Sequence, residues 1–594
     1  MWAIETTGLM KSFGKNTVLK GIDLKVKKGN IHAILGPNGS GKTTLIKIFS
    51  TLLKADDGII RVAGHDVSDQ PDKVRESISL TGQNASVDEE LTGYENLYLF
   101  ARLLRFSVSE ARQRANELLA AFLLNEAGTR LVKNYSGGMR RKLDIAASIV
   151  RITDLLFLDE PTTGLDPRSR NALWELIRGI ARQGTTILLT TQYLEEAEQL
   201  ADKISVLDEG RIISEGTSDE LKKSVGNNML HVHLNGVDNQ HLESVLYRMN
   251  IKPVHFEENN RKISFRVLGH KEAIGILDNL QSNEVEITAF NLARPDLNEV
   301  FLSLTGDLKD TEGEGLPDEN RKGSQKDTFS VSRLLENASP VKSTRFLSNK
   351  FMFGWRNLIK IKHIPEQFMD VLITPVMFTF MFTYLFGGAL AGSTKAYLQF
   401  FIPGILVQTL TFNTVYAGIN INNDISKGIF DRFRSMPIWL PAPLSGIFVG
   451  DFFRHLISAS VVISLGYLLG FRVEAGLPAF ILSFLIIIFF AMSISWIFII
   501  MGLILRSNSA VMSFGWLILM PLVFMSNIFT DPSTMPGWLQ TFIRYNPLAW
   551  QVDVVRGLLS GSATAAGLLK AMGASAVLTV VLFPVTIWFY KKER

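Results

Sequence analysis

Residues 31–44 read IHAILGPNGSGKTT, and this stretch decides the fold of the N-terminal half. The apolar run that ends at Leu35 predicts a buried strand, and a Gly-x4-Gly-Lys-Thr pattern follows it from Gly36. Glycines let backbone N–H groups curl around phosphates, and a helix beginning at Lys42 points its positive end at them. The stretch therefore predicts a phosphate-binding loop, and the residues expected to contact a nucleotide are Gly36, Pro37, Asn38, Gly39, Ser40, Gly41, Lys42, Thr43 and Thr44.

An acidic pair follows a second apolar run, in DLLFLDEP (154–161). Asp159 and Glu160 stand at the end of a predicted buried strand, downstream of the phosphate loop. Asp159 is expected to hold Mg²⁺ together with the Thr43 hydroxyl, whereas Glu160 can take a proton from an attacking water, the task of a general base. The pair predicts hydrolysis of the bound nucleotide.

A second anion site is predicted where YSGGMRRKLDIAASI (135–149) opens a helix. Alone, Ser136-Gly137-Gly138 fits a helix cap equally well. With the two earlier motifs it resembles the signature of the ATP-binding cassette (ABC) ATPases, LSGGQ. Tyr135 and Met139 depart from that consensus at its edges, while the Ser-Gly-Gly core is kept.

The resemblance covers residues 2 to about 225 and implies further roles. Phe13 looks like the aromatic that stacks on adenine, Gln83 like the glutamine that joins Mg²⁺ to the membrane domain, and Asp166 like the loop that crosses between paired subunits. In this family the signature, here Ser136 to Met139, contacts ATP held by another subunit. The chain has one phosphate loop and one signature, so it is expected to pair, as a homodimer or a heterodimer.

Gln192 stands where many ABC ATPases have a histidine, in ILLTTQYLEEAEQLAD (187–202). No histidine lies between His65 and His231, so nothing nearby replaces it. An amide donates and accepts hydrogen bonds as neutral imidazole does, but it does not titrate. With SLTGQ and ARPDLNEVFLSLTG, this stretch is similar to the daunorubicin/doxorubicin-resistance subgroup, where Gln is usual. We therefore expect a working ATPase with Glu160 as base and Gln192 as phosphate sensor.

The 594 residues, 47% of them hydrophobic, are too many for one core and divide by composition into four regions. The net charge of +4 is small, so a nucleic-acid-binding surface is not indicated, and the absence of cysteine excludes disulfides and thiol chemistry. We expect an α/β P-loop ATPase with an α-helical signature subdomain (1–228), a small ferredoxin-like α+β accessory domain (229–306), a flexible linker (307–345) and an all-α six-span membrane domain (346–594).

The membrane region begins with KFMFGWRNLIKIKHI (350–364), where basic and apolar residues alternate as in an interfacial helix. Lys427, Arg432 and Arg434 after the second span, with the terminal KKER, place the ATPase and both termini in the cytosol of a plasma-membrane protein. The long external segment at about 530–568 is expected to fold back onto the membrane. The six apolar spans begin near Met369, Phe400, Leu444, Leu477, Ala510 and Lys570.

Residues 346–594 resemble the membrane domain of type-2 ABC exporters. ININNDISKGIFDRFRSMPI (419–438) looks like the cytosolic coupling helix, or is a basic loop that only fixes topology. Polar residues at helical spacing in span two either line a path between subunits or pack against neighbouring helices; they are Thr409, Asn413, Tyr416 and Asn420.

Three smaller groups of polar residues carry weaker expectations. Asp451, Arg454 and His455 are expected to form a salt-bridge cluster near the cytosolic end of span three. The pair Asp553/Arg556 is expected to bond internally or with neighbours. His231 and His233 share a strand face but are too few for a metal site.

Together these features predict an ATP- and Mg²⁺-dependent exporter half-transporter that contacts membrane lipid and carries a hydrophobic or amphipathic small molecule. This cargo class follows mainly from the resemblance. Two alternatives remain at the level of sequence: an exporter of polysaccharide, glycolipid or peptide with the same architecture, and a non-transporting membrane switch driven by ATP binding.

Overall fold

The computed structural model describes residues 1–225, short segments between 228 and 301, and residues 346–591. The chain forms two compact units. The first contains Met1–Gln83 and Ile152–Ala338, and the second contains Asn84–Arg151 and Ser339–Arg594. The predicted signature subdomain thus belongs to the same compact unit as the membrane helices. The predicted linker, 307–345, lies outside the described residues.

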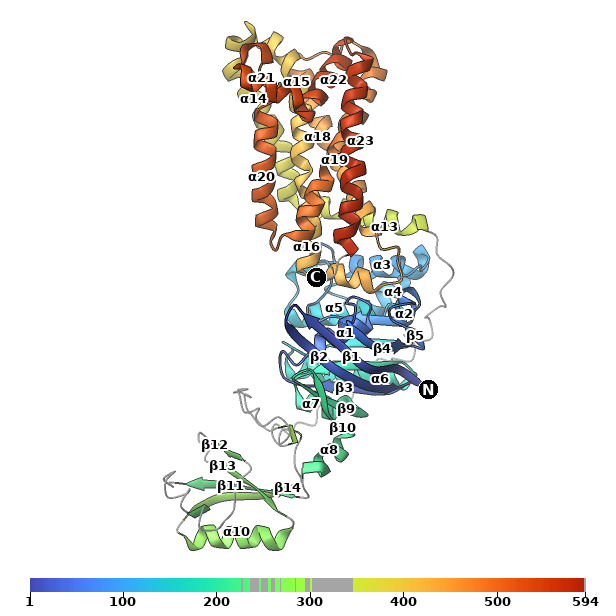
Figure 1. Ribbon diagram of the computed structural model, residues 1–594, viewed down its shortest axis with the longest axis vertical. Helices are drawn as coiled ribbons and strands as arrows, with labels where there is room; N and C mark the ends of the chain where they lie inside the picture. Colours follow the sequence, from blue (N-terminus) through green and yellow to red (C-terminus); the bar gives the residue numbers. More distant parts are fainter. Residues whose placement is uncertain are drawn as a thin grey trace. The chain divides into compact units, whose positions relative to one another are not determined.

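The first unit is built on a six-stranded sheet in the order β10-β9-β3-β8-β7-β6, of which β10, β9 and β3 are labelled in Figure 1. Strands β9, β3, β8, β7 and β6 are parallel, and β10 pairs antiparallel with β9. Every residue of β3, β7 and β8 is buried, which explains their continuous apolar sequences. The strands are β3 (Ile31–Leu35), β6 (Ile78–Thr81), β7 (Leu155–Asp159), β8 (Thr186–Thr191), β9 (Lys203–Asp208) and β10 (Arg211–Gly216).

A second sheet, in the order β2-β1-β4-β5, is antiparallel, and it shares one buried apolar cluster with the parallel sheet and α1. Its strands are β1 (Trp2–Phe13), β2 (Asn16–Lys27), β4 (Asp57–Val62) and β5 (His65–Asp66). The helices of this unit are α1 (Lys42–Phe49), α2 (Pro71–Ser77), α6 (Pro167–Arg182), α7 (Leu194–Leu200) and α8 (Ser218–Val225). The P-loop α/β ATPase fold predicted from the sequence is confirmed.

The accessory segment forms an antiparallel sheet in the order β12-β13-β11-β14, backed by helix α10. A ferredoxin-like α+β domain has two helices; the segments expected to form the other one, 241–249 or 297–304, lie largely outside the described residues. His231 bonds through Nδ1 to Ser264 Oγ at 2.9 Å, and no group of three or more potential metal-binding side chains occurs in the described chain. The elements are β11 (Asn228–Asn235), β12 (His255–Glu257), β13 (Lys262–Val267), α10 (His270–Ser282) and β14 (Glu286–Ala293).

The signature subdomain in the second unit consists of α3 (Gly93–Leu103), α4 (Val108–Ala121) and α5 (Gly137–Ser148). Both α3 and α4 begin at capping boxes, Thr92 with Glu95 and Ser107 with Glu110. Each box satisfies backbone N–H groups that the first helical turn leaves without partners.

The membrane half of this unit is all helical (Figure 1). Five segments among the described residues are long and apolar enough to cross a bilayer, namely Leu372–Ala391, Thr394–Ser426, Ala442–Leu469, Gly476–Ile504 and Ala565–Lys591. The fifth predicted span is α20 (Asn508–Phe524), which has only 17 residues, shorter than the roughly 20 that a perpendicular span needs. Besides α20, the described α-helices of this half, including those that form the five long segments, are α13 (Phe346–His363), α14 (Pro365–Ala391), α15 (Thr394–Asn413), α16 (Val415–Ser426), α17 (Ile429–Ser435), α18 (Ala442–Leu469), α19 (Gly476–Ile504), α21 (Gly537–Tyr545), α22 (Pro547–Ser560) and α23 (Ala565–Lys591).

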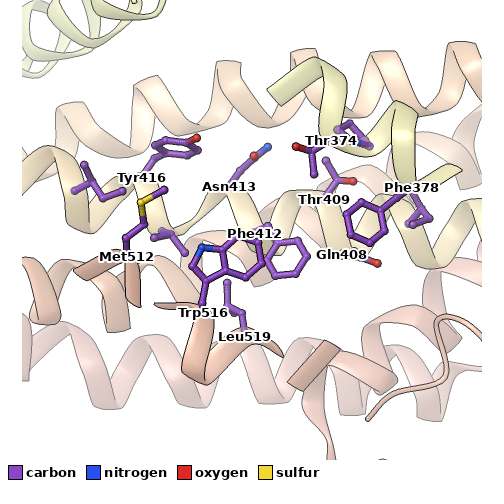
Figure 2. A pocket seen from close by; sticks show the side chains of 14 residues that line it. Thr374, Phe378, Gln408, Thr409, Phe412, Asn413, Tyr416, Met512, Trp516 and Leu519 are labelled. Atoms are coloured by element: carbon purple, nitrogen blue, oxygen red, sulfur yellow. The ribbon is translucent and has the colours of Figure 1, made fainter. Parts of the chain in front are cut away.

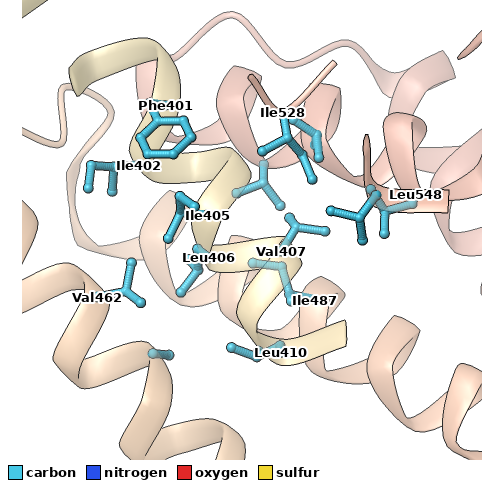
Figure 3. Close-up of a cluster of buried hydrophobic side chains, with 14 of the residues drawn as sticks. Phe401, Ile402, Ile405, Leu406, Val407, Leu410, Val462, Ile487, Ile528 and Leu548 are labelled. Atoms are coloured by element: carbon cyan, nitrogen blue, oxygen red, sulfur yellow. The ribbon is translucent and has the colours of Figure 1, made fainter. Parts of the chain in front are cut away.

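Close packing and lipid-facing surfaces both mark this half as membrane-embedded. A cluster centred on α15 joins α18, α19, α20 and α22 (Figure 3). Helices α16 and α19 touch through glycine, since a Cβ on Gly418 would lie 2.3 Å from the Phe498 carbonyl oxygen. Large apolar side chains are exposed along α14, α20 and α23, as lipid contact requires.

Candidate functional site: a nucleotide site, a signature helix and a membrane pocket

The phosphate loop runs from the end of β3 into the first turn of α1, and it contains all nine residues predicted to contact phosphates. Gly36 is required there, because a Cβ would lie 2.2 Å from the Leu207 carbonyl oxygen. Gly39 and Gly41 take left-handed conformations, with φ of 86° and 109°. Helix α1 therefore begins at Lys42, as predicted.

Lys42 is buried beneath this loop. Its Nζ donates to the carbonyls of Gly36 (2.7 Å) and Pro37 (2.9 Å) and lies 3.7 Å from Glu160 Oε1. Burial lowers the pKa of Lys42, while the nearby Glu160 and Asp159 oppose that shift. The ammonium group is thus held by the loop and by the predicted general base together.

The predicted catalytic residues follow the carboxyl ends of four adjacent parallel strands, β3, β8, β7 and β6. Thr190 at the end of β8 donates to Asp159 Oδ1 at 2.5 Å, and Gln83 Nε2 lies 3.5 Å from Glu160 Oε2. Gln192 comes directly after Thr191, whose carbonyl accepts from the Gly36 N–H at 3.3 Å. Residues 36, 83, 159, 160 and 192, far apart in sequence, therefore meet at one sheet edge.

One buried polar atom of the loop is left for a ligand. Ser40 is 3% exposed and its Oγ has no hydrogen-bond partner. Buried hydroxyls are normally bonded, so an orphan inside a glycine-rich loop fits a phosphate oxygen as the missing partner. The Thr43 hydroxyl, the Asp159 carboxylate and the Gln83 amide oxygen supply the hard oxygen donors that Mg²⁺ prefers.

Two further predicted residues, Phe13 and Asp166, stand at the ends of elements. Phe13 ends β1 with 47% of its surface exposed, and the Lys11 ammonium lies 5.6 Å from its ring centroid. Asp166 caps α6 by accepting from the Ser169 N–H at 3.0 Å.

Ser136 caps the signature helix α5, since its Oγ accepts from the Met139 N–H at 3.3 Å. Gly137 and Gly138 form the first turn of the helix. Tyr135, which stands where the family signature has leucine, makes local contacts of its own. Its hydroxyl donates to the Ala127 carbonyl at 2.6 Å, and a Cβ on Gly93 would lie 2.2 Å from that hydroxyl. The tyrosine thus fastens the signature to the start of α3.

A charged cluster that sequence analysis missed joins the signature subdomain to the membrane helices. The Arg356 guanidinium donates to Asp88 (2.7 Å) and forks onto both oxygens of Asp424 (2.7 and 2.6 Å). Lys360 Nζ lies 2.9 Å from Asp88 Oδ2 and 3.2 Å from Glu90 Oε2. Burial opposes ionisation of Asp88, yet Arg356 and Lys360 hold its pKa below its ordinary value.

This cluster revises the expectation for residues 350–364. The helix is present as α13, but Arg356 and Lys360 are buried against protein carboxylates instead of facing lipid headgroups. The basic residues of α13 and the acid in ININNDIS were the available signals, although their pairing could not be read from the sequence.

A pocket with a cavity volume of about 90 Å³ lies between α14, α15, α16 and α20 (Figure 2). Of the predicted path residues, Thr409, Asn413 and Tyr416 line it, and Asn420 does not. Its walls combine aromatic rings with Gln408, a buried side chain whose Oε1 has no partner. The other labelled lining residues are Thr374, Phe378, Phe412, Met512, Trp516 and Leu519.

Polar residues of α18 stand behind this pocket. Asn413 donates to Ser458 Oγ at 2.7 Å, and the Arg454 guanidinium lies 5.0 Å from the Tyr416 ring centroid. Arg454 pairs with Asp451 at 2.7 Å as predicted, but His455 does not join them: it is fully buried and neither ring nitrogen has a partner.

The remaining predicted pair braces the segment between α20 and α23. Asp553 and Arg556 are 3.8 Å apart, and their closer contacts are with neighbours. Asn527 donates to Asp553 at 2.5 Å, while Arg556 donates to the carbonyls of Asn527 (3.0 Å) and Phe400 (3.2 Å).

Three family models match three separate segments of the chain. The family model for the ABC transporter ATPase matches residues 19–163, that for the C-terminal domain of DrrA1-3-like ATP-binding proteins matches 216–305, and that for the ABC-2 type transporter matches 351–559. Over 305 residues, the chain is 50% identical to the daunorubicin/doxorubicin resistance ATP-binding protein DrrA of Streptomyces peucetius, covering 51% of this chain and 92% of that protein.

The chain belongs to the ABC transporter family. Its membrane half has a relative of its own, the daunorubicin resistance ABC transporter permease protein DrrB1 of Streptomyces coeruleorubidus, at 41% identity over 40% of this chain and 85% of that protein. The linearmycin resistance ATP-binding protein LnrL of Bacillus subtilis (strain 168) is 31% identical over 51% of this chain and 98% of that protein. This ABC transporter thus joins in one chain an ATPase and a membrane domain, and it couples ATP hydrolysis to transport.

Proposed function

We propose that this transporter exports an amphipathic, aromatic small molecule of the drug or antibiotic class, working as a dimer of identical chains. The observation that supports this most is the pairing of a complete nucleotide site with a membrane pocket walled by aromatic rings and a buried amide. The names of the relatives, which refer to resistance against daunorubicin, doxorubicin and linearmycin, point to the same cargo class.

Hydrolysis in this proposal depends on Glu160. Its carboxylate lies beside Lys42 and Gln83 at the sheet edge, where it can accept a proton from a water attacking the terminal phosphate. Lys42 and the N–H groups of the loop bind and orient the phosphates. Gln192 contributes an amide N–H to a phosphate oxygen without titrating, so this contact does not change with pH.

Mg²⁺ would be held by Thr43 and Asp159, with Gln83 as a third oxygen donor. When bound, the ion neutralises charge on the phosphate oxygens. Thr190 keeps the Asp159 carboxylate in place by donating to it at 2.5 Å.

The dimer follows from the number of motifs. The chain has one phosphate loop and one signature, so an ATP sandwiched between Ser136 of one copy and Lys42 of another requires two copies. Asp166 would face the second copy. A heterodimer with a related chain would show as inactivity of the purified homodimer.

In the membrane, we place the cargo against Thr409, Asn413 and Tyr416. Gln408 Oε1 is a buried acceptor without a partner, so a cargo hydroxyl or ammonium group would satisfy it. Phe412 and Trp516, with ring centroids 5.2 Å apart, offer flat apolar surface for an aromatic core. We also propose that α20 forms a sixth span, with both termini in the cytosol of a plasma-membrane protein.

The test is ATP-driven uptake of daunorubicin into inside-out plasma-membrane vesicles that contain the transporter. Uptake should require Mg²⁺ and ATP and should disappear in Glu160→Gln vesicles, which still bind nucleotide. ATP hydrolysis with no drug uptake, but with transport of a glycolipid or peptide, would favour the alternative cargo. Nucleotide binding with negligible turnover would favour the switch.

A further inference from the structure

The signature helix α5 is held by side chains from the membrane half at two points. Arg432, on the short helix α17, forms an ion pair with the Asp144 carboxylate, and its Nη2 donates to the Asp144 carbonyl at 3.1 Å. The same guanidinium lies 4.5 Å from the Phe100 ring centroid on α3. Arg432 is 4% exposed and Asp144 is fully buried, so water does not compete for this contact.

The second point is a carboxylate shared between the two sides. Glu89 Oε1 lies 2.8 Å from Arg140 Nη1 on the signature helix, and Glu89 Oε2 lies 2.8 Å from Lys427 Nζ of the membrane half. Glu89 therefore bridges a cation of α5 and a cation that directly precedes α17.

The backbone beside Glu89 also holds the segment that leads into the signature. The Glu89 carbonyl accepts from the Lys133 N–H at 3.0 Å, and the Leu91 carbonyl accepts from the Val132 N–H at 2.9 Å. Both bonds lie just before Ser136. The signature turn is therefore fixed from its helix side and from its loop side.

An α-helix is stiff and rises about 1.5 Å per residue, so Asp144 is joined to Ser136 by a rigid rod of about 12 Å. Burial raises the pKa of Asp144, and Arg432 and Arg141 oppose that shift. Parting Arg432 from Asp144 would remove the nearer of the two cations that face this buried carboxylate and leave only Arg141, 3.5 Å from Oδ2, which is costly. Movement of α17 is therefore expected to carry α5 with it.

We propose that Arg432 and Lys427 are positioning residues that set the place of the signature turn, Arg432 through Asp144 and Lys427 through Glu89. The membrane half then acts on the partner's ATP through the signature helix, in addition to any route through Gln83. This inference rests on the proposed function, because it assumes the proposed dimer, in which the signature of one copy contacts the ATP that the other copy holds.

The first experiment compares Arg432→Gln with Arg434→Gln in the full chain in lipid. Arg434 is a matched control on the same helix, where it stacks on Phe430 at 5.8 Å. Arg432→Gln should lower daunorubicin-stimulated ATP turnover about tenfold, because a misplaced group of this kind costs rate rather than binding. Binding of a fluorescent ATP analogue should change less than twofold in either variant, and Arg434→Gln should turn over as wild type.

Glu89→Gln and Lys427→Gln guard against misfolding, because both side chains are more than a quarter exposed. Each should lower stimulated turnover about threefold, and the double variant should lose no more than either single one, as expected for a shared contact. Wild-type turnover in Arg432→Gln, an equal loss of nucleotide binding, or additive losses in the double variant would overturn the proposal.

A readout that needs no cargo separates this inference from the proposed function. The chain has no cysteine, so a copy that carries spin labels at Asn134→Cys and Ser426→Cys, mixed with an excess of unlabelled copies, reports one distance within a subunit, from the signature to the segment that precedes α17. We expect a narrow distribution that stays unchanged on nucleotide binding and broadens in Arg432→Gln. A distance that changes with nucleotide in the wild type contradicts rigid positioning, whereas unstimulated turnover with this pattern intact contradicts only the proposed drug cargo.

Discussion

Two buried charged clusters in this transporter differ in how completely they satisfy themselves. At the phosphate loop, Lys42 and Glu160 lie beside Ser40, a buried hydroxyl without a partner. At the charged cluster around Arg356, here called the coupling cluster, the guanidinium donates to both carboxylate oxygens of Asp424 and also to Asp88. The first arrangement is built to be completed by a ligand, and the second is complete within the protein. Charge in the first serves chemistry, and charge in the second joins two parts of the chain.

Loss of the general base should produce the largest effect. Glu160→Gln should lower ATP turnover about 10²–10⁴-fold, the usual contribution of a positioned base. Phosphate release from the purified transporter in lipid measures it, and nucleotide binding is the control. If the wild type is no faster than this variant, Glu160 does not act as base.

The coupling cluster should respond in the opposite way. Arg356→Met leaves Asp88 and Asp424 without their main partner and should destabilise the protein by about 3–5 kcal/mol, the usual cost of breaking a buried pair. Thermal unfolding in detergent measures this, with Lys350→Met on the same helix as a control. An unchanged midpoint would show that the cluster does not hold the two parts together.

The difference between the clusters also explains what the sequence could predict. The phosphate loop, the acidic pair and the signature are contiguous motifs, so Lys42, Glu160 and Ser136 could be predicted once the three motifs were considered together. The coupling cluster is assembled from residues 88, 356, 360 and 424, and no local pattern pairs them. The alternating basic residues of α13 predicted a helix correctly, but its burial depends on tertiary packing.

Strand β3, which carries the phosphate loop, should make stability depend on pH. Burial, with a contribution from Lys203, lowers the pKa of His32 to about 3. Below pH 6.5 the His32 imidazole binds a proton in the unfolded chain but stays neutral in the folded chain. The free energy of unfolding therefore decreases as the pH falls, by about 1.4 kcal/mol per pH unit well below pH 6.5.

The measurement is thermal inactivation of ATPase activity between pH 7 and pH 5. His32→Gln removes the titrating group and should flatten this dependence. An equally steep fall in His32→Gln would assign it to other groups.

The smallest effect is expected at Gln192. Gln192→Ala should lower turnover about tenfold, the loss of one charge-assisted hydrogen bond of about 1.4 kcal/mol. Gln192→His should restore most of that rate and add a dependence on pH near 6.5, which the wild-type amide lacks. ATPase rates from pH 5.5 to 8.5 decide this, and identical profiles for all three proteins would remove Gln192 from the mechanism.

The most direct test of the account measures phosphate release and daunorubicin uptake in the same proteoliposomes. If the nucleotide site drives export through the membrane pocket, the two rates should rise and saturate together with drug concentration, and both should fall in Glu160→Gln. The account would be contradicted if phosphate release continued at full rate, was not stimulated by daunorubicin, and was accompanied by no daunorubicin uptake.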